Sequence, residues 1–475
     1  MKLDLNWKFN KKVLWVWLVF LIVLLLECAM KWTYGQFKRI NLDEVALVIQ
    51  VGTGGVDDKM LWGFIKRVIF RAGGWSVALT AIYQIFYNYK FVRCTLFAIV
   101  FGILGMRFAT TNVQLGSFFN RTTSDFYERE YVNPESVNIS FPKKRNVLMI
   151  ALESIEKSYG DTKMFGKKGL TPHISKLQKN HVSFEQYEEL SGLTHTIAAI
   201  TGMTTGLPMF YTSYKNIEKM VGAHGIGRIF KKNGYQTYSF FPASGKFSLK
   251  ENFLRRMGFD TIYDGEKLLS MLDYELDVKP FDGIDDGTLF RMTKPMIKDI
   301  INDKKPYFIL METINVHSEG YFTQACRDLG FKQETLEDII KCEDKIIADF
   351  VKWFRAQDPS AVVILINDHT AHLAIGSLEQ LEGLKSRPLA NAFINTNVFY
   401  GTNVKRPVAA FDFFPTIIEA AGGKIAGCRL GLGTSLTAWC KGVKTLREKY
   451  GDKELERLME QKNDLYYKLA TGKGK

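Results

Sequence analysis

Short apolar runs that end abruptly at polar residues constrain the fold of this chain more than any other feature. The clearest covers residues 146–152 and ends at Glu153, and similar runs cover residues 307–311 and 361–366, with a weaker one at 236–241. Such runs are too short and too rich in β-branched residues to favour helix, so we expect buried strands. Helical patterns lie between them, at residues 225–233, 288–302, 336–357 and 412–421. Strands that alternate with helices predict an α/β fold with a mostly parallel central sheet and helices on both faces.

The first hundred residues carry the apolar segments of a membrane anchor. Residues 13–26 form an unbroken apolar run after a segment that contains Lys2, Lys8, Lys11 and Lys12. A signal-peptide core is the alternative, but no small-residue cleavage site follows, so we expect a retained span with its basic end in the cytoplasm. Two further spans are expected at residues 73–87, after an amphipathic interfacial segment, and at 91–106. Three spans that start inside place everything after about residue 109 outside the cytoplasm.

Charge and cysteine content agree with this topology. The net charge of +13 suits an anionic membrane surface or phosphate-bearing substrates, and no basic block is interleaved with aromatic residues, so a nucleic-acid partner is not expected. Four of the six cysteines form two close pairs in the polar part of the chain: Cys326, Cys342, Cys428 and Cys440. Two local disulfides in an oxidising compartment would fit this spacing, although unpaired buried thiols are an alternative.

Polar residues follow the predicted strands, where a parallel sheet would bring them to one edge. These residues are Glu153, His317, Asp368 and His369. Because ligands bind outside the carboxyl ends of parallel strands, we expect them to converge in one crevice. Glu153, Asp368 and His369 would make an oxygen-rich ligand set with one imidazole. Such a set suits Mn²⁺ or Mg²⁺, with Zn²⁺ as an alternative.

The stretch from Ser191 to Gly202 reads as a glycine-marked loop that runs into an apolar helix. Thr194 or Thr196 would then lie at the helix start, where the first backbone N–H groups are unpaired and favour an anion. Threonine at such a position is usually only a cap. A metal ion bound to the hydroxyl oxygen would lower its pKa and make it a nucleophile. The residues by themselves leave the choice between the two threonines open.

Together these motifs resemble the alkaline phosphatase/sulfatase superfamily. More narrowly, they look like its membrane-anchored phosphoglycerol transferases, the branch with the lipoteichoic acid synthases and the periplasmic glucan phosphoglycerol transferase. The resemblance covers roughly residues 130–440. Its main elements are residues 146–154, Thr194 to Ala198 with Gly206-Leu207-Pro208, and Asn367-Asp368-His369. It extends through residues 171–174, 246–254, 258–260, 285–290 and 431–436, and takes in the Cys326/Cys342 pair.

The resemblance implies a role for each candidate residue. Glu153, Asp368, His369 and Thr196 would bind the metal, Mn²⁺ first among the candidates, and Thr196 would be the nucleophile. His317 would contact the transferred phosphate or protonate the leaving oxygen, and Cys326 and Cys342 would form a disulfide. The further candidates for contacts with phosphate or glycan are Lys246, Lys250 and His195.

The chain is expected to divide into four parts. Residues 1–108 would be an anchor of about three transmembrane helices, 109–145 a connector, and 146–440 an extracytoplasmic catalytic domain. Residues 441–475 would form a charged, solvated amphipathic tail helix. The protein would be a multi-pass protein of the bacterial cytoplasmic membrane, with its catalytic domain in the periplasm or extracellular space.

The expected activity is metal-dependent transfer of phosphoglycerol from a phosphatidylglycerol-type lipid to a glycan or polymer, through a phospho-threonine intermediate. Pro242-Ala243-Ser244 stands where the synthases carry a head-group-binding histidine, which leaves the head group open. A phosphoethanolamine transferase acting on lipid A or glycan is therefore an alternative, although its Gly-Glu-Thr-Ala-like and Cys-Gly-Thr elements are missing. A sulfatase activity is disfavoured, because no Cys/Ser-x-Pro-x-Arg sequence is present. A non-catalytic glycan- or lipid-binding membrane protein of the same fold is the third reading.

Overall fold

The computed structural model of the chain describes residues 11–37, 40–41, 62–111, 113–114, 122–210, 220, 223–317, 320–371, 378–381, 384–399, 401 and 403–472. The chain forms two compact units, one built mainly from residues before 116 and the other from residues after it.

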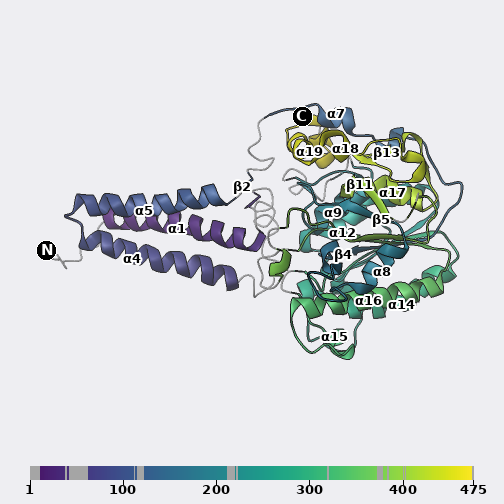
Figure 1. Cartoon of the computed structure of the whole chain (residues 1–475), viewed down its shortest axis with the longest axis horizontal. Coiled ribbons are helices and arrows are strands. Elements are labelled where there is room, and N and C mark those ends of the chain that lie inside the picture. The colour runs from purple at the N-terminus through teal and green to yellow at the C-terminus, as the bar shows by residue number, and fades with distance from the viewer. Residues whose placement is uncertain are drawn as a thin grey trace. The chain divides into compact units, whose positions relative to one another are not determined.

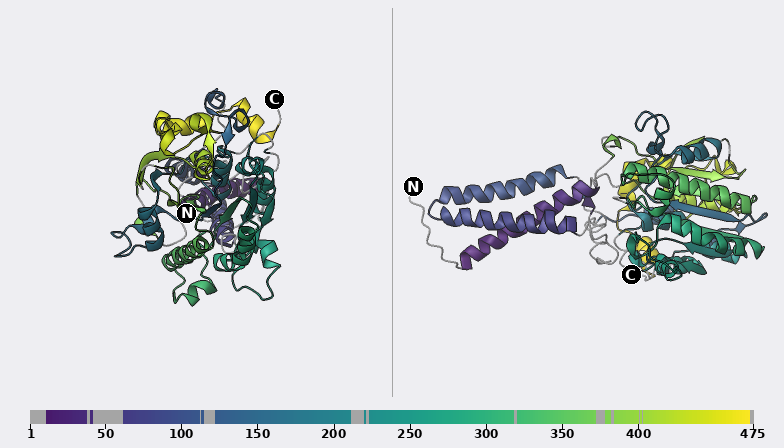
Figure 2. Two further views of the ribbon diagram at one scale, coloured as in Figure 1. Left: turned by 90° about the vertical axis from the view of Figure 1, so that its right-hand side faces the viewer. Right: turned by 90° about the horizontal axis from the view of Figure 1, so that it is seen from below.

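Three long helices make up most of the described part of the first unit: α1 (Lys11–Phe37), α4 (Arg71–Ile85) and α5 (Lys90–Thr110). A π-helix, η1 (Ile65–Phe70), leads directly into α4. Helix α1 packs against both α4 and α5, and Figure 2 shows it crossing this antiparallel pair obliquely. Two short strands, β1 (Ile40–Asn41) and β2 (Val113–Gln114), pair in parallel.

Among the described helices, α1 and α5 contain segments long and apolar enough to cross a membrane, over Lys11–Tyr34 and Lys90–Thr110. Helix α4 coincides with the second expected span and has 15 residues, and the helical backbone extends before it through η1, where Lys66 and Arg67 interrupt the apolar pattern. Large apolar side chains point away from the helix contacts, with Trp15 68% exposed and Phe91 83% exposed. Surfaces of this kind suit contact with lipid.

The second unit is organised around a six-stranded sheet in the order β10-β9-β4-β8-β6-β7. Its strands are β4 (Val147–Leu152), β6 (Gln236–Phe240), β7 (Thr261–Tyr263), β8 (Tyr307–Glu312), β9 (Val362–Asn367) and β10 (Asn391–Ile394). Every neighbouring pair is parallel except β10 with β9. All residues of β4, β8 and β9 are buried, which explains their continuous apolar runs.

Helices cover both faces of this sheet, as Figure 1 shows. One layer contains α8 (Pro172–Asn180), α14 (Asp286–Asn302) and α16 (Leu336–Gln357), with α16 packed against both of the others. The other contains α9 (Thr196–Thr205), α11 (Ile226–Lys232), α12 (Lys250–Met257) and α17 (Phe413–Ala420), all in contact with α9 or α11. The predicted α/β class with a mostly parallel sheet is confirmed, and β10 adds one antiparallel edge strand.

Smaller elements complete the second unit. The short helices are α7 (Phe126–Glu130), α13 (Gly265–Leu269) and α15 (Gln324–Asp328). The two-stranded pairs are β5 (Ser183–Tyr187) with β11 (Asn403–Val408), β3 (Ile139–Ser140) with β12 (Lys424–Ile425), and β13 (Arg429–Leu430) with β14 (Gly433–Thr434).

The charged tail differs from the single solvated helix expected from residue 441 onward. It forms three short helices, α18 (Leu446–Tyr450), α19 (Asp452–Met459) and α20 (Asp464–Thr471), with Gly451 at a positive φ of 70° between the first two. Leu455 and Met459 are buried, and the Tyr127 hydroxyl of α7 donates to the Met459 carbonyl at 3.1 Å. The apolar positions of the tail therefore pack against the second unit.

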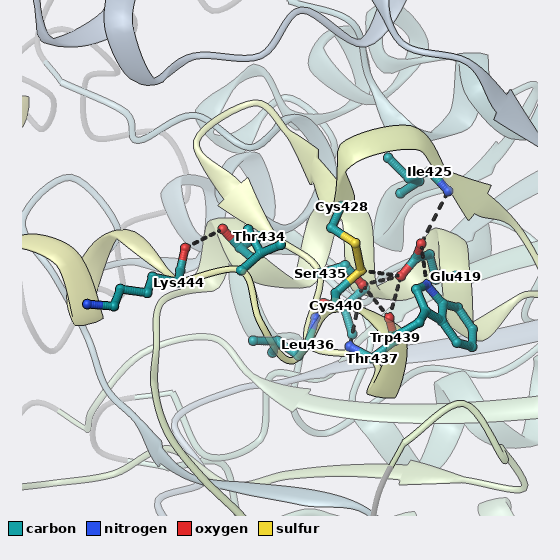
Figure 3. Close-up of a disulfide and its surroundings, with 12 residues drawn as sticks. Glu419, Ile425, Cys428, Thr434, Ser435, Leu436, Thr437, Trp439, Cys440 and Lys444 are labelled. Atoms are coloured by element: carbon teal, nitrogen blue, oxygen red, sulfur yellow. Dashed lines mark hydrogen bonds between the residues drawn. A yellow bond between two sulfur atoms is a disulfide. The ribbon is translucent and has the colours of Figure 1, made fainter.

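The two pairs of cysteines that lie close in the sequence of this unit are both disulfides, Cys326–Cys342 and Cys428–Cys440. Figure 3 shows the second of these beside the buried carboxylate of Glu419. That carboxylate accepts hydrogen bonds from the side chains of Ser435, Thr437 and Trp439 and from the backbone N–H of Ile425. The disulfide and this carboxylate together hold residues 425–440 onto α17.

Candidate active site

The polar residues that follow β4 and β9 meet at one edge of the sheet. These strands are parallel neighbours, with Leu152 opposite Asn367, so Glu153 and Asp368 leave the sheet side by side. One ligand atom from each of Glu153, Asp368 and His369 lies within 4.8 Å of the others. All three side chains are buried, with at most 3% of their surface exposed.

Hydrogen bonds from the two turns fix this cluster. Ser154 adopts a φ of 55°, a strained value for a residue other than glycine, and donates its backbone N–H to Asp368 Oδ1 at 3.0 Å and its hydroxyl to Glu153 Oε1 at 2.7 Å. His369 Nδ1 lies 3.0 Å from the Thr370 carbonyl oxygen. The other ring nitrogen, Nε2, is 3.4 Å from oxygens of both Glu153 and Asp368. Each candidate ligand is thus oriented before any ion binds.

The hydroxyl of Thr196 adjoins the same cluster. Thr196 is the first residue of α9, and its Oγ1 lies 3.2 Å from Glu153 Oε2 and 3.3 Å from His369 Nε2. Thr194 is only 3% exposed, whereas Thr196 is half-buried. Of the two threonines that the sequence left open, Thr196 therefore has the accessible hydroxyl beside the cluster. His195 is the N-cap residue of α9 and is half-buried.

The charge of the cluster fits a divalent cation. Burial raises the pKa of Asp368 to about 7, and the neighbouring Glu153 carboxylate acts in the same direction. Burial disfavours protonation of His369, but the carboxylates of Asp368 and Glu153 outweigh it and raise its pKa to about 9. Both pKa values are raised because the buried carboxylates have too little positive charge beside them. Two carboxylates, an imidazole and a hydroxyl form a donor set that Mn²⁺ or Mg²⁺ binds, and that Zn²⁺ also accepts.

The other predicted site residues have different surroundings. His317 follows β8 and is half-buried, with its ring edge-on to Phe281 at 4.7 Å between centroids. Lys246 is largely exposed and pairs with Glu266 at 2.7 Å. Lys250 is buried, with its ammonium paired to Glu312 and 5.0 Å from the centre of the Phe241 ring. The predicted substrate contact of Lys250 would therefore have to compete with a buried carboxylate.

Glu312 is a residue of this region to which the sequence analysis assigned no role. It ends β8 opposite Ala151 of β4, is 1% exposed, and has one carboxylate oxygen, Oε1, without a hydrogen-bond partner among the described residues. Burial raises its pKa, and Lys250 opposes that shift. Like Glu153, it stands at the end of an apolar run, and this sequence pattern marks both residues as strand-end carboxylates.

Two buried carboxyl groups brace the loop that carries His317. Asp286 accepts hydrogen bonds from the backbone N–H groups of Ile314 and Asn315, and the Asn315 side chain donates to Glu343 at 3.0 Å. Burial raises the pKa of Asp286 to about 8. Nothing in their local sequence marks these residues, because they meet only when α14 and α16 pack together. The remaining histidines, His173, His181 and His224, lie outside the cluster, and His372 lies outside the described residues.

A family model described as Sulfatase matches residues 145–423, which is more than half of the chain. The chain belongs to the sulfatase family. The matched range contains every strand of the large sheet, the three residues of the cluster and Thr196. The membership that the motifs indicated is thereby confirmed.

The curated relatives of this chain include phosphoglycerol transferase I of Escherichia coli (strain K12). It is 26% identical over 256 residues, which are 51% of this chain and 33% of the relative. The alignment thus spans only about a third of the relative's length. These relatives fit the phosphoglycerol transferase branch that the sequence resembles.

Two solved structures support the sulfatase-family fold. A protein in the alkaline phosphatase superfamily from Vibrio parahaemolyticus has a TM-score of 0.53 and 20% identity, over 64% of this chain and 74% of that one. The lipoteichoic acid synthase LtaP from Listeria monocytogenes has a TM-score of 0.50 and 18% identity, over 64% and 79%. At these identities the likeness concerns the fold.

Proposed function

We propose that this chain is a membrane-anchored, metal-dependent phosphotransferase that moves phosphoglycerol from a phosphatidylglycerol-type lipid to an extracytoplasmic glycan or polymer. The observation that carries the proposal is the position of the Thr196 hydroxyl. It lies at the start of α9, within hydrogen-bond distance of both Glu153 and His369. The names of the curated relatives support phosphoglycerol as the transferred group.

Glu153, Asp368, His369 and the Thr196 hydroxyl would hold the divalent ion, with Mn²⁺ the first candidate. When bound, the ion would acidify the hydroxyl and offset the negative charge of the phosphoryl oxygens. The first backbone N–H groups of α9 lack partners within the helix, so they would stabilise the same oxygens. His317, braced through Asp286, would contact the phosphate or donate a proton.

The reaction would proceed by two displacements. In the first, the Thr196 hydroxyl would pass its proton toward Glu153 Oε2, to which it donates a hydrogen bond, and Oγ1 would form a bond to phosphorus. The bond from phosphorus to the diacylglycerol oxygen would break, and that oxygen would take up a proton from His317. In the second, an acceptor hydroxyl would return a proton to His317 and form a bond to phosphorus, while the bond from phosphorus to Oγ1 breaks and Thr196 takes back its proton. The product is phosphoglycerol on the acceptor, and Thr196 is regenerated. Phosphoethanolamine transfer would use the same steps with a different head group.

The deciding experiment replaces Thr196. Thr196→Ala is expected to lower transfer by roughly a thousand-fold or more, because the nucleophilic oxygen is removed. Thr196→Ser keeps a hydroxyl and should retain measurable transfer. The peptide that contains residue 196 is analysed by mass spectrometry after incubation with phosphatidylglycerol or phosphatidylethanolamine. The mass of the adduct identifies the nucleophile and the head group.

Normal turnover by Thr196→Ala would refute the proposed mechanism. An adduct formed from phosphatidylethanolamine but not phosphatidylglycerol would reassign the head group. Metal content is measured in the same preparations, because Thr196→Ala keeps three of the four donors and should still bind the ion. Failure of both wild type and variant to bind Mn²⁺, Mg²⁺ or Zn²⁺ would favour a non-catalytic binding protein.

A further inference from the structure

A group of cations lies at one end of the helical anchor. Helices α4 and α5 are antiparallel and joined by residues 86–89, so η1 and the start of α4 lie at the end where α5 finishes. Lys66 and Arg67 belong to η1, and Arg71 is the first residue of α4. This is the end from which the chain continues toward the catalytic unit.

Contacts with α1 confirm that these helix ends lie together. Val68 and Ala72 form a buried cluster with Cys28 of α1, and the rings of Trp32 and Phe64 meet edge to face at 5.2 Å. On α5, Arg107 donates to Glu27 of α1 at 3.1 Å. Helix α1 therefore contacts η1, the start of α4 and the last turn of α5.

The cations of η1 and α4 differ from Arg107 in having no acidic partner. Lys66, Arg67 and Arg71 are exposed, and no side chain in the described part of the protein forms an ion pair with them. Arg67 and Arg71 are four residues apart on one helical segment, so their like charges repel. An anion placed between them would relieve this repulsion.

The surroundings of the three cations are aromatic and apolar. Trp62 is 56% exposed, Phe70 64% and Trp75 58%, and all three lie within one or two turns of Arg67 or Arg71. Aromatic side chains of this kind collect at the head-group level of a membrane. The backbone here is π-helical over Ile65–Phe70, a rare conformation that is frequent at functional sites.

We infer that Lys66, Arg67 and Arg71 form a binding site for the phosphate of an anionic phospholipid head group. On the proposed topology these cations face outward, against the usual cytoplasmic excess of Lys and Arg, so simple orientation of the anchor does not account for them. The inference rests on the proposed function and deepens it. The site would gather, beside the catalytic unit's point of attachment, the class of lipid that the reaction consumes.

The test measures lipid binding separately from turnover. Full-length protein carrying Thr196→Ala is titrated with phosphatidylglycerol, phosphatidylserine, phosphatidylethanolamine or phosphatidylcholine, and bound lipid is counted by native mass spectrometry. We expect both anionic lipids to bind more tightly than both zwitterionic ones. The variant Lys66→Gln/Arg67→Gln/Arg71→Gln should weaken phosphatidylglycerol binding by roughly ten-fold or more, since it removes the three cations that would contact the lipid phosphate.

Two further variants make the result specific. Lys11→Gln/Lys12→Gln/Lys90→Gln removes the same charge from exposed positions at the other end of the bundle and should leave binding unchanged. Lys66→Arg/Arg67→Lys/Arg71→Lys keeps the charge and should bind like the parent. The helical signal in circular dichroism spectra checks that the anchor of each variant protein is folded.

The inference would be overturned if both triple glutamine variants lost phosphatidylglycerol binding equally. It would also be overturned if the variant at Lys66, Arg67 and Arg71 bound this lipid as tightly as the parent. Equal affinity for zwitterionic and anionic lipids would have the same consequence. These outcomes are distinct from failure of the proposed function, which appears as turnover by Thr196→Ala whatever the lipid-binding result.

Discussion

Lys250 and Glu312 form a buried ion pair at the end of β8. Both residues are at most 5% exposed, and the free Oε1 of Glu312 already lacks a hydrogen-bond partner among the described residues. Lys250→Met would leave a buried carboxylate without its cation. We expect the catalytic unit to lose about 3–5 kcal/mol of unfolding free energy, measured by denaturant titration.

Lys246→Met is the matched control, because Lys246 makes an exposed ion pair with Glu266 and should change stability little. If Lys250 instead served mainly to bind substrate, Lys250→Met would impair lipid or acceptor binding without loss of stability. That result would contradict a structural role for the pair and restore the substrate contact that the family resemblance suggested.

At the scale of elements, the buried carboxylate of Glu419 joins α17 to the segment closed by Cys428–Cys440, as seen in Figure 3. Glu419→Ala would remove the acceptor of three buried residues, Ile425, Ser435 and Thr437, and of the exposed Trp439. Each unpaired buried group costs roughly 1–3 kcal/mol, so we expect a loss of at least about 3 kcal/mol. The measurement is the thermal midpoint of the catalytic unit.

Glu454→Ala, which removes an exposed carboxylate from α19, serves as the comparison and should leave that midpoint nearly unchanged. The disulfide should reduce this loss of stability, because it restricts the conformations that residues 428–440 can adopt in the unfolded chain. Adding a reductant to Glu419→Ala is therefore expected to lower the midpoint further than it does in the wild type. Equal effects of reductant on the two proteins would show that the Glu419 carboxylate and the disulfide stabilise this segment independently.

At the scale of the molecule, the number of membrane crossings decides where the catalytic unit lies. If the basic N-terminus is cytoplasmic, crossings by α1, α4 and α5 place the residues after α5 outside, whereas crossings by α1 and α5 alone would return them to the cytoplasm. The two disulfides favour the oxidising side. We therefore predict that α4 crosses the membrane although it has only 15 residues.

Cysteine labelling tests this topology. In a Cys94→Ser background, Asn88→Cys lies in the turn between α4 and α5, and Ser136→Cys lies on the exposed surface of the second unit. A membrane-impermeant maleimide should label residue 136 in intact cells and residue 88 only after permeabilisation. Labelling of residue 88 from outside would show that α4 does not cross.

Much of this molecule follows from local sequence. The runs at 147–152, 307–312 and 362–367 encode buried strands, because continuous apolar character suits a sheet covered on both faces. Parallel strands carry the residues after them to one edge, which is why Glu153, Asp368 and His369 could be grouped before their distances were known.

Only the tertiary structure decided which side chains pair across long separations. It joined Lys250 to Glu312 and packed the charged tail onto the second unit as three helices. The physical reason is that propensity and burial pattern act over a few neighbouring residues. An ion pair or a buried contact depends on how distant segments meet in space, and no local pattern records that meeting.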